Sequence, residues 1–313
     1  MANQEKFKTT IGGQALIEGI LMRGPEKDAV VIRGKDGLTL EVTDRKLHKP
    51  GSITTWPFLR GIFGFFDAQV VGVKALMRSA DLAPEEIQEE PSKFDLWLEK
   101  NLGSEAFQKA IVGIAVAMGL GLSILLFFLL PMTIASFFDK IIPSILGINL
   151  LEGLIRMIIF LAYMVLISRM KEMRRVFSYH GAEHKTIRCY ECGLPLTVEN
   201  VRAQTRFHPR CGTSFLLVVI VVSILVNSVV RLDNSFARMG AHLLLLPVVV
   251  GISYEINRWC GRHDNLLSAV LSAPGKWLQR ITTFEPDDGM IECAIRAMEL
   301  VIPEEKGSDE WGK

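Results

Sequence analysis

Residues 111–138 read IVGIAVAMGLGLSILLFFLLPMTIASFF, an uncharged run that sets the class of fold. At about 1.5 Å per residue, a helix of this length exceeds the roughly 30 Å hydrocarbon core of a bilayer. We therefore expect a transmembrane helix that is tilted, or kinked at Pro131. Three further apolar segments, at about 148–168, 215–230 and 241–256, predict a mainly α-helical, polytopic membrane protein with about four transmembrane helices.

The last two apolar segments are short for spanning helices. They are separated only by residues 231–240, which predicts a tight transmembrane hairpin over residues 215–257. Two re-entrant segments are the alternative interpretation, because each segment falls below the usual length of a span.

Positive charges predict the orientation of these segments. Residues 169–214 carry nine lysines and arginines, whereas residues 139–147 carry one and residues 231–240 carry two. Because cytoplasmic loops are enriched in positive residues, we expect residues 169–214 and both termini on the cytoplasmic side of the cell membrane. The polar first ten residues lack the apolar core of a signal peptide, so targeting is expected to come from an internal segment.

An acidic, proline-bounded stretch, DLAPEEIQEEP at 81–91, predicts the clearest boundary in the chain. Before it, a β-hairpin at about 29–42 and an amphipathic helix at about 58–78 predict a small α+β cytoplasmic or interfacial region. At the other end we expect a helix at about 288–301 and a disordered tail. The predicted regions are thus 1–92, 93–168, 169–214, 215–257 and 258–313.

The hydrophilic segment 169–214 contains the motif His180-Gly-Ala-Glu183-His184. Two histidines four residues apart lie on one face of a helix, close enough to share a divalent ion, and Ser178 is a candidate cap for a short helix there. The order His-x-x-Glu-His is the inverted form of a zinc-hydrolase motif, in which the glutamate acts as general base. A polar helix at the membrane surface is the alternative.

Two ligand types recur later in the same segment, at His208 and Cys211. They complete a metal site with His180 and His184, or form a turn before the third apolar segment. Together with Cys189 and Cys192 they instead spell C-x2-C-x15-H-x2-C, the spacing of a structural zinc ribbon. A reducing cytoplasm favours metal binding over disulfides for these cysteines. The two sites compete for the same ligands.

Glu255 is a weaker candidate ligand, at the end of the fourth apolar segment. An acid at this boundary fits a third metal ligand, but an ion pair with Arg258 or Arg262 fits it better. The net charge of only +1 gives no reason to expect a nucleic-acid partner.

Several motifs together resemble the YqhQ-like family of uncharacterised, multipass bacterial membrane proteins, which are described as predicted metal-dependent enzymes. The motifs are GGQALIEGILMRGP, YHGAEHKTI, YECGLPLTVENV, HPRCGTSF and TTFEPDDGMIECAI. The resemblance covers nearly the whole chain. It implies a centre built from His180, Glu183, His184, Glu191, His208 and Cys211, without Cys189 and Cys192. It also implies that the glycine-rich motif with Glu18 folds against this segment.

Two functions remain from the sequence. The first is a zinc-type hydrolase at the cytoplasmic membrane face, with Glu183 as catalytic base and a lipid-linked molecule or membrane peptide as substrate. The second is a non-enzymatic assembly or scaffold protein in which a structural zinc ion joins the loop to the helices. The sequence assigns neither a reaction nor an oligomeric state.

Overall fold

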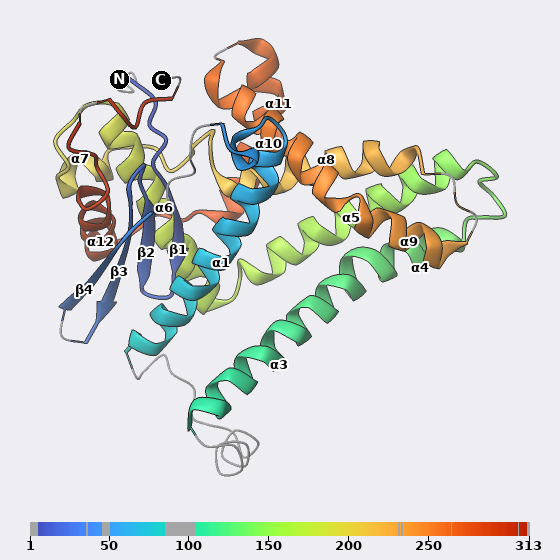
Figure 1. Cartoon of the computed structure of the whole chain (residues 1–313), viewed down its shortest axis with the longest axis horizontal. Coiled ribbons are helices and arrows are strands. Elements are labelled where there is room, and N and C mark those ends of the chain that lie inside the picture. Colours follow the sequence, from blue (N-terminus) through green and yellow to red (C-terminus); the bar gives the residue numbers. More distant parts are fainter. Residues whose placement is uncertain are drawn as a thin grey trace. The chain divides into compact units, whose positions relative to one another are not determined.

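The structure, a computed structural model, describes residues 6–35, 37–45, 51–84, 104–230, 232, 234–263, 265–305 and 307–311 (Figure 1). Over these residues the chain is mainly helical, with one four-stranded antiparallel sheet. It divides into two compact units. The first comprises residues 1–84, 164–222 and 246–313, and the second comprises 85–163 and 223–245. Most of the linker predicted at 81–91 lies outside the described residues.

The sheet belongs to the first unit. Strands β1 (Gly12–Leu16), β2 (Gly19–Arg23), β3 (Lys27–Gly34) and β4 (Gly37–Asp44) follow one another in a simple meander. The predicted hairpin is confirmed as β3 and β4, with Gly34 opposite Gly37 beside the turn. The glycine-rich stretch before it, to which the sequence analysis assigned no secondary structure, supplies the other two strands.

Helices cover both faces of this sheet (Figure 1). Because side chains alternate along a strand, Ile20 and Met22 pack into the core formed with α6 (Lys171–Glu191) and α12 (Asp288–Glu299). Leu21, between them, packs instead in a cluster with Ala75 of α1 (Leu59–Leu82). Each such buried side chain contributes about 1.5–3 kcal/mol to stability. The amphipathic helix predicted at about 58–78 is confirmed as α1.

Helix α6 is the main departure from the prediction for residues 169–214. The segment is not a loop with a short helix capped by Ser178. The helix begins at Lys171, after the extended residue Met170, and the Ser178 hydroxyl donates a hydrogen bond to the Arg174 carbonyl one turn earlier. Charged residues make the segment polar on average, but Tyr179, Ala182 and Ile187 are buried in the core, and tertiary packing lengthens the helix.

The first unit also contains α7 (Val198–Arg202), most of α8 (Gly212–Ser228), α10 (Leu246–Arg262) and α11 (Leu266–Thr282). The C-terminal helix predicted at about 288–301 is confirmed as α12, and the Asp287 carboxylate caps it by accepting a hydrogen bond from the Met290 amide. For the tail the prediction was disorder, but its described residues 307–311 pack on the N-terminal residues. Asp309 is buried, and it accepts a hydrogen bond from the Thr9 hydroxyl at 2.5 Å.

The second unit contains α3 (Ser104–Ile124), α4 (Leu130–Ser136), most of α5 (Ile145–Ile167) and α9 (Ser235–Leu244). A π-helical turn at Leu125–Leu129 joins α3 to α4. It directly precedes Pro131, whose ring cannot donate to the helical ladder. The irregularity predicted at this proline therefore takes the form of a π-bulge.

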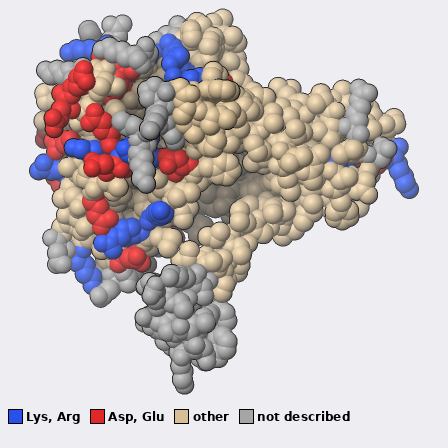
Figure 2. Space-filling model, viewed as in Figure 1, with Lys and Arg blue, Asp and Glu red and all other residues tan. Residues whose placement is uncertain are grey.

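Two helices are long and apolar enough to cross a membrane, Ile111–Ser136 and Ile145–Ile167, as the first two predicted spans require. None of the most apolar window of the first is buried, and its exposed side chains include Met118 and Leu120. On the face drawn in Figure 2, the surface over the apolar helices carries very few charged side chains. An exposed apolar surface of this extent is typical of contact with lipid.

The predicted third and fourth spans differ from the expectation. Helix α8 (Gly212–Ser228) is apolar but short, and the fourth segment is a helix pair, α9 and α10, bent by 43° around Leu245. The described residues thus contain two candidate spans, or three if the bent pair is one span, and the predicted four are not confirmed. The ten-residue turn at 231–240 is wrong, because α9 begins at Ser235 with Asn234 as its cap.

Candidate metal centre

One face of α6 carries the three residues of the His-x-x-Glu-His motif. His180, Glu183 and His184 are spaced three and four apart, so their side chains leave the helix on one side. Gly181 brings this part of the helix against the backbone of Phe284, and a Cβ at that position would collide with the Phe284 carbonyl oxygen. The close approach places His180 beside the residues that end α11.

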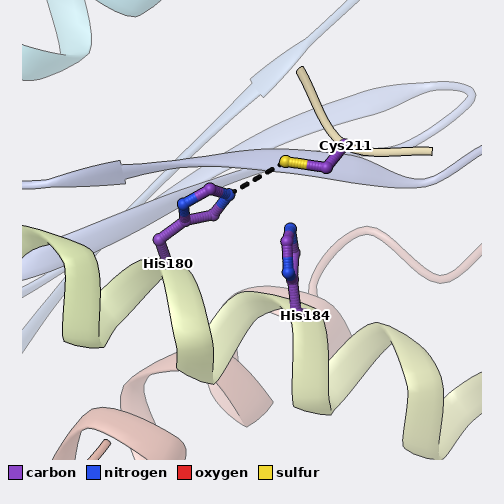
Figure 3. Close-up of side chains that lie close together, drawn as sticks. All are labelled: His180, His184 and Cys211. Carbon is purple, nitrogen blue, oxygen red and sulfur yellow. Dashed lines mark hydrogen bonds between the residues drawn. The ribbon is translucent and has the colours of Figure 1, made fainter. Parts of the chain in front are cut away.

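His180 meets Cys211 across the centre (Figure 3). Its Nδ1 donates a hydrogen bond to the Thr282 carbonyl at 2.8 Å, and its Nε2 lies 3.1 Å from the Cys211 Sγ. Thr213 also faces this sulfur, with its hydroxyl oxygen at 3.1 Å and its amide nitrogen at 3.4 Å. The carbonyl contact fixes the imidazole so that Nε2 is the ligand atom presented to the centre.

His184 is held in the same way. Its Nδ1 donates to the Arg206 carbonyl at 2.6 Å, and its buried Nε2 has no hydrogen-bond partner. Leaving a buried polar nitrogen without a partner costs about 1–3 kcal/mol. A positively charged ligand at Nε2 would remove that cost, and Figure 3 shows the ring directed toward Cys211 and His180.

His180, His184 and Cys211 together can hold one metal ion. The possible ligand atoms of the three residues all lie within 4.8 Å of one another. In a tetrahedral zinc site, with bonds of about 2.0–2.3 Å, neighbouring ligand atoms are roughly 3.5 Å apart. Small side-chain adjustments therefore suffice. Two imidazole nitrogens and one thiolate sulfur are the donor types that zinc prefers, and the unpaired His184 Nε2 fits the same conclusion.

The electrostatics of the centre favour a thiolate. Burial alone would raise the pKa of the Cys211 thiol, but the neighbouring His180 and His184 hold it well below its usual value. Burial opposes a charged His180, yet the sulfur of Cys211 and the carboxylate of Glu183 raise the pKa of this imidazole to about 9. Without an ion, the centre therefore favours an imidazolium beside a thiolate. A bound cation would replace the imidazolium proton as the positive charge beside the thiolate.

Glu183 lies beside the three donors but is not one of them. Burial, and then the Cys211 sulfur, raise the pKa of its carboxyl, while the two histidines and the Gly13 amide act in the opposite direction. Its Oε2 is buried without a hydrogen-bond partner. Strand β1 packs closely on this carboxylate, because a Cβ on Gly13 would lie 3.1 Å from the Glu183 Cδ. The same Cβ would lie only 2.6 Å from the Leu21 carbonyl oxygen, so the position requires glycine.

The centre opens into a pocket of about 550 Å³. His180, Glu183, His184 and Cys211 lie on its wall, together with residues of β1, α1 and α8. Much of the remaining wall is apolar, formed by Phe65, Val176, Phe177, Phe215 and Leu216. A ligand that reaches the three donors would therefore pass along an apolar surface.

His208, a predicted fourth ligand, lies next to the centre but outside the donor group. Its ring centroid is 5.6 Å from that of His184, and its Nε2 is 3.3 Å from the Glu191 carboxylate. Glu191 is fully buried, where it also pairs with Arg210 and accepts a hydrogen bond from the Thr9 amide at 2.9 Å. Burial lowers the pKa of His208 to about 4, so the imidazole is neutral. We call His208, Glu191 and Arg210 the Glu191 cluster.

The weaker candidates also lie apart from the centre. The Cys189 thiol faces the Pro195 carbonyl, and the Cys192 thiol faces the Gln204 side chain. Within the described chain, the one group of three or more candidate ligands contains neither, so the zinc-ribbon interpretation is not supported.

Glu255 pairs with Arg60 through both oxygens, rather than with Arg258 or Arg262, and it accepts a hydrogen bond from the Phe58 amide.

Comparison with known proteins places the chain in a family. The family model described as "Protein of unknown function (DUF1385)" matches residues 56–304. The chain belongs to the DUF1385 family. It is also 33% identical to "Uncharacterized protein YqhQ" of Bacillus subtilis (strain 168) over 316 residues, covering 98% of this chain and 97% of that protein. The YqhQ-like resemblance is thereby confirmed as a family relationship. No solved structure matches.

Several residues that build the centre in this DUF1385 chain were not predicted. The Thr282 and Arg206 carbonyls orient the two imidazoles, and the Gly13 amide contacts Glu183. These are backbone groups, which leave no signal in residue types. The expected approach of the glycine-rich motif is confirmed, because Glu18 pairs with Arg175 of α6 and accepts a hydrogen bond from the Tyr179 hydroxyl at 3.1 Å.

Proposed function

We propose that the chain is a metal-dependent hydrolase with a zinc-type centre at His180, His184 and Cys211. The observation that supports this best is the combination of three converging donors with a pocket that opens onto them. Structural zinc sites are closed by four protein ligands, whereas catalytic sites keep a position free for water or substrate.

Glu183 is the proposed general base. His180, His184 and Cys211 would hold the ion, and when bound it would supply Lewis acidity that makes a water molecule easier to deprotonate. The raised pKa of Glu183 suits a group that must take up a proton near neutral pH. Its unpartnered Oε2 is free to accept that proton, and the Gly13 backbone limits how far the carboxylate can turn away.

The proposed setting is the cytoplasmic face of the cell membrane, with a multipass topology of up to four spans and both termini in the cytoplasm. The excess of positive charge in residues 169–214 supports this orientation. The apolar wall of the pocket suits a substrate with a lipid-like or membrane-embedded part, either a lipid-linked molecule or a membrane peptide.

The alternative proposal is a non-enzymatic assembly or scaffold protein, in which the same three donors hold a structural ion. Loss of the ion should then destabilise the contact between α6 and the segment before α8. Glu183→Gln should have no effect, because the carboxylate would have no chemical task. The open pocket favours the hydrolase.

A comparison of Glu183→Gln with wild type tests the proposal. The metal-loaded full chain would be incubated in mixed micelles with panels of amphiphilic esters, amides and phosphodiesters. We expect the wild type to hydrolyse at least one class, and Glu183→Gln to bind the ion equally well but react at least about 100-fold more slowly. Glu172→Gln, an exposed acid on the same helix, is the matched control. Hydrolysis by Glu183→Gln at the wild-type rate would refute the assigned role.

A further inference from the structure

The second unit contains a buried polar cluster that the proposed function does not use. Asn149, Glu152 and Arg156 lie on one face of α5, which is a candidate membrane span, and Arg238 and His242 lie one turn apart on α9. Asn227, near the end of α8, completes the cluster. All six residues are at most 7% exposed. Ionisable groups buried among apolar helices are costly and are usually functional.

Several polar atoms of the cluster are hydrogen-bonded. Arg156 donates to the Phe127 carbonyl and to the Glu152 carboxylate, both at 2.7 Å. The Asn149 side-chain amide donates to the carbonyls of Asn227 and Val230 at 3.0 and 2.9 Å. These bonds fix α5 against the end of α8.

Other polar atoms of the cluster have no hydrogen-bond partner. They are Oδ1 of Asn149, Oδ1 of Asn227, Oε2 of Glu152, Nε2 of His242, and both Nε and Nη2 of Arg238. A buried polar group without a hydrogen bond is costly, so this concentration of them calls for a partner that the surrounding side chains do not supply.

Arg238 shows which kind of ligand fits. Nε and Nη2 form the edge of a guanidinium that grips two oxygens of one anion. Elsewhere in this chain the same edge binds a carboxylate, in the pairs of Arg60 with Glu255 and of Arg175 with Glu18. In Arg238 this edge is buried and neither nitrogen has a hydrogen-bond partner, although Arg238 forms a loose ion pair with Glu152. The nearest acidic oxygen, Oε2 of Glu152, is 3.8 Å from Nε, too far for a hydrogen bond.

The charge of the cluster also favours an anion as the ligand. Arg156 and Arg238 each carry one formal positive charge and Glu152 is the one acidic member, so the six residues have an excess of formal positive charge before His242 is counted. His242 is oriented toward the same carboxylate, with its Nδ1 3.5 Å from Oε1 of Glu152. An additional negative charge beside Arg238 would balance the cluster.

We propose that Arg238 and His242, with Glu152, Asn149 and Asn227 around them, form a binding site for a small monovalent anion, of the size of chloride or formate. The free edge of Arg238 and the Nε2 of His242 donate to the anion. Because the six side chains are buried, the site selects small anions over phosphate esters or lipid headgroups. The site is independent of the metal centre.

Anion binding to the purified full chain in detergent tests this proposal. The line width of the 35Cl NMR signal would be measured as formate is added, with gluconate as a bulky control at equal ionic strength. We expect excess broadening in wild type that formate abolishes and gluconate does not. The thermal midpoint should also rise with chloride until it saturates.

The variants separate the site from surface effects. Arg238→Gln should lose the formate-sensitive broadening. Arg238→Lys should weaken chloride binding about tenfold, because lysine lacks the two parallel donors of the guanidinium. Arg296→Gln, which replaces an exposed arginine, should bind chloride as wild type does. If Arg238→Gln fails to fold, the chloride affinity of Arg238→Lys decides the test. The proposal is overturned if wild type shows no formate-sensitive broadening, or if Arg238→Lys binds as wild type. Either result would mean that Arg238 closes onto Glu152 as an ordinary ion pair.

Discussion

The metal centre and the Glu191 cluster lie side by side, and both combine buried acids with histidines. In the Glu191 cluster the acid has a partner on every side, because Thr9, His208 and Arg210 all reach Glu191. In the metal centre, Glu183 and His184 each present a buried atom without a partner. In the first arrangement the acid is fully paired, and only the buried Nε of Arg210 has no hydrogen-bond partner, whereas in the second both the acid and a histidine present such an atom to a pocket.

This difference distinguishes two roles that the residue types alone do not distinguish. His184 and His208 are both buried histidines near α6, but one directs an unpaired nitrogen into the centre and the other uses its nitrogen on Glu191. A buried polar group that pairs with its neighbours stabilises the fold, whereas one without a hydrogen-bond partner needs an explanation, and for Glu183 and His184 the adjacent pocket offers one, a bound ligand. The experiments below test that distinction, from the largest expected effect to the smallest.

Removing the acid's charge should destabilise the Glu191 cluster but not the metal centre. Glu191→Gln leaves the buried Arg210 without its counter-charge, so the free energy of unfolding should fall by about 3–5 kcal/mol. Glu183→Gln should leave it unchanged or raise it in metal-free protein, because this carboxylate is buried with one oxygen unpartnered. Denaturant unfolding of both variants in detergent measures the difference. Equal losses would erase the distinction between the sites.

Acidification should weaken the fold through His208. Burial lowers the pKa of its imidazole to about 4 in the folded chain. The unfolded chain takes up the proton near the ordinary value of about 6.5, so stability is lost as the pH falls from about 6.5 to 4, by about 3 kcal/mol. The free energy of unfolding would be measured against pH for wild type and for His208→Gln. The difference between the two curves gives the contribution of His208. A difference that stays constant over this range would contradict the neutral, buried assignment.

A smaller effect is expected from the backbone that orients His180. Gly181→Ala places a Cβ against the Phe284 carbonyl oxygen, so α6 must move from the segment that holds His180 Nδ1. We expect a loss of about 1–3 kcal/mol in stability, together with weaker metal binding. Gly212→Ala is the control beside Cys211, since its added Cβ would meet no atom within 4 Å. Comparable losses in both variants would argue against a specific contact.

Local patterns predicted much of the fold. Apolar runs predicted α3 and α5, alternation around Gly34 and Gly37 predicted the β3–β4 hairpin, and the acid-rich start predicted α12. The glycine-rich stretch was not predicted to form β1 and β2, because its strands become apparent only once α1 and α6 cover them. The full length of α6 was missed for the same reason, since its buried face is hidden among charged residues.

The candidate site was predicted in part. Spacing along a helix is a local property, so His180, Glu183 and His184 could be grouped from the motif. Cys211 and His208 were equal candidates, and only the family resemblance ranked them above Cys189 and Cys192. That choice depends on which side chains find other partners. His208 contacts Glu191 and Arg210, and Glu191 is in turn held by the backbone amide of Thr9, which is distant in the sequence.

Elemental analysis of the purified full chain, expressed in zinc-supplemented medium, tests the central claim most directly. We predict about one divalent ion per chain in wild type and in His208→Ala, and a loss of at least about tenfold in His184→Ala and Cys211→Ala. Unfolding of each variant would be measured in parallel, so that loss of the ion is separated from loss of the fold. A wild-type chain without stoichiometric metal, or a folded His184→Ala chain that keeps its ion, would contradict the account.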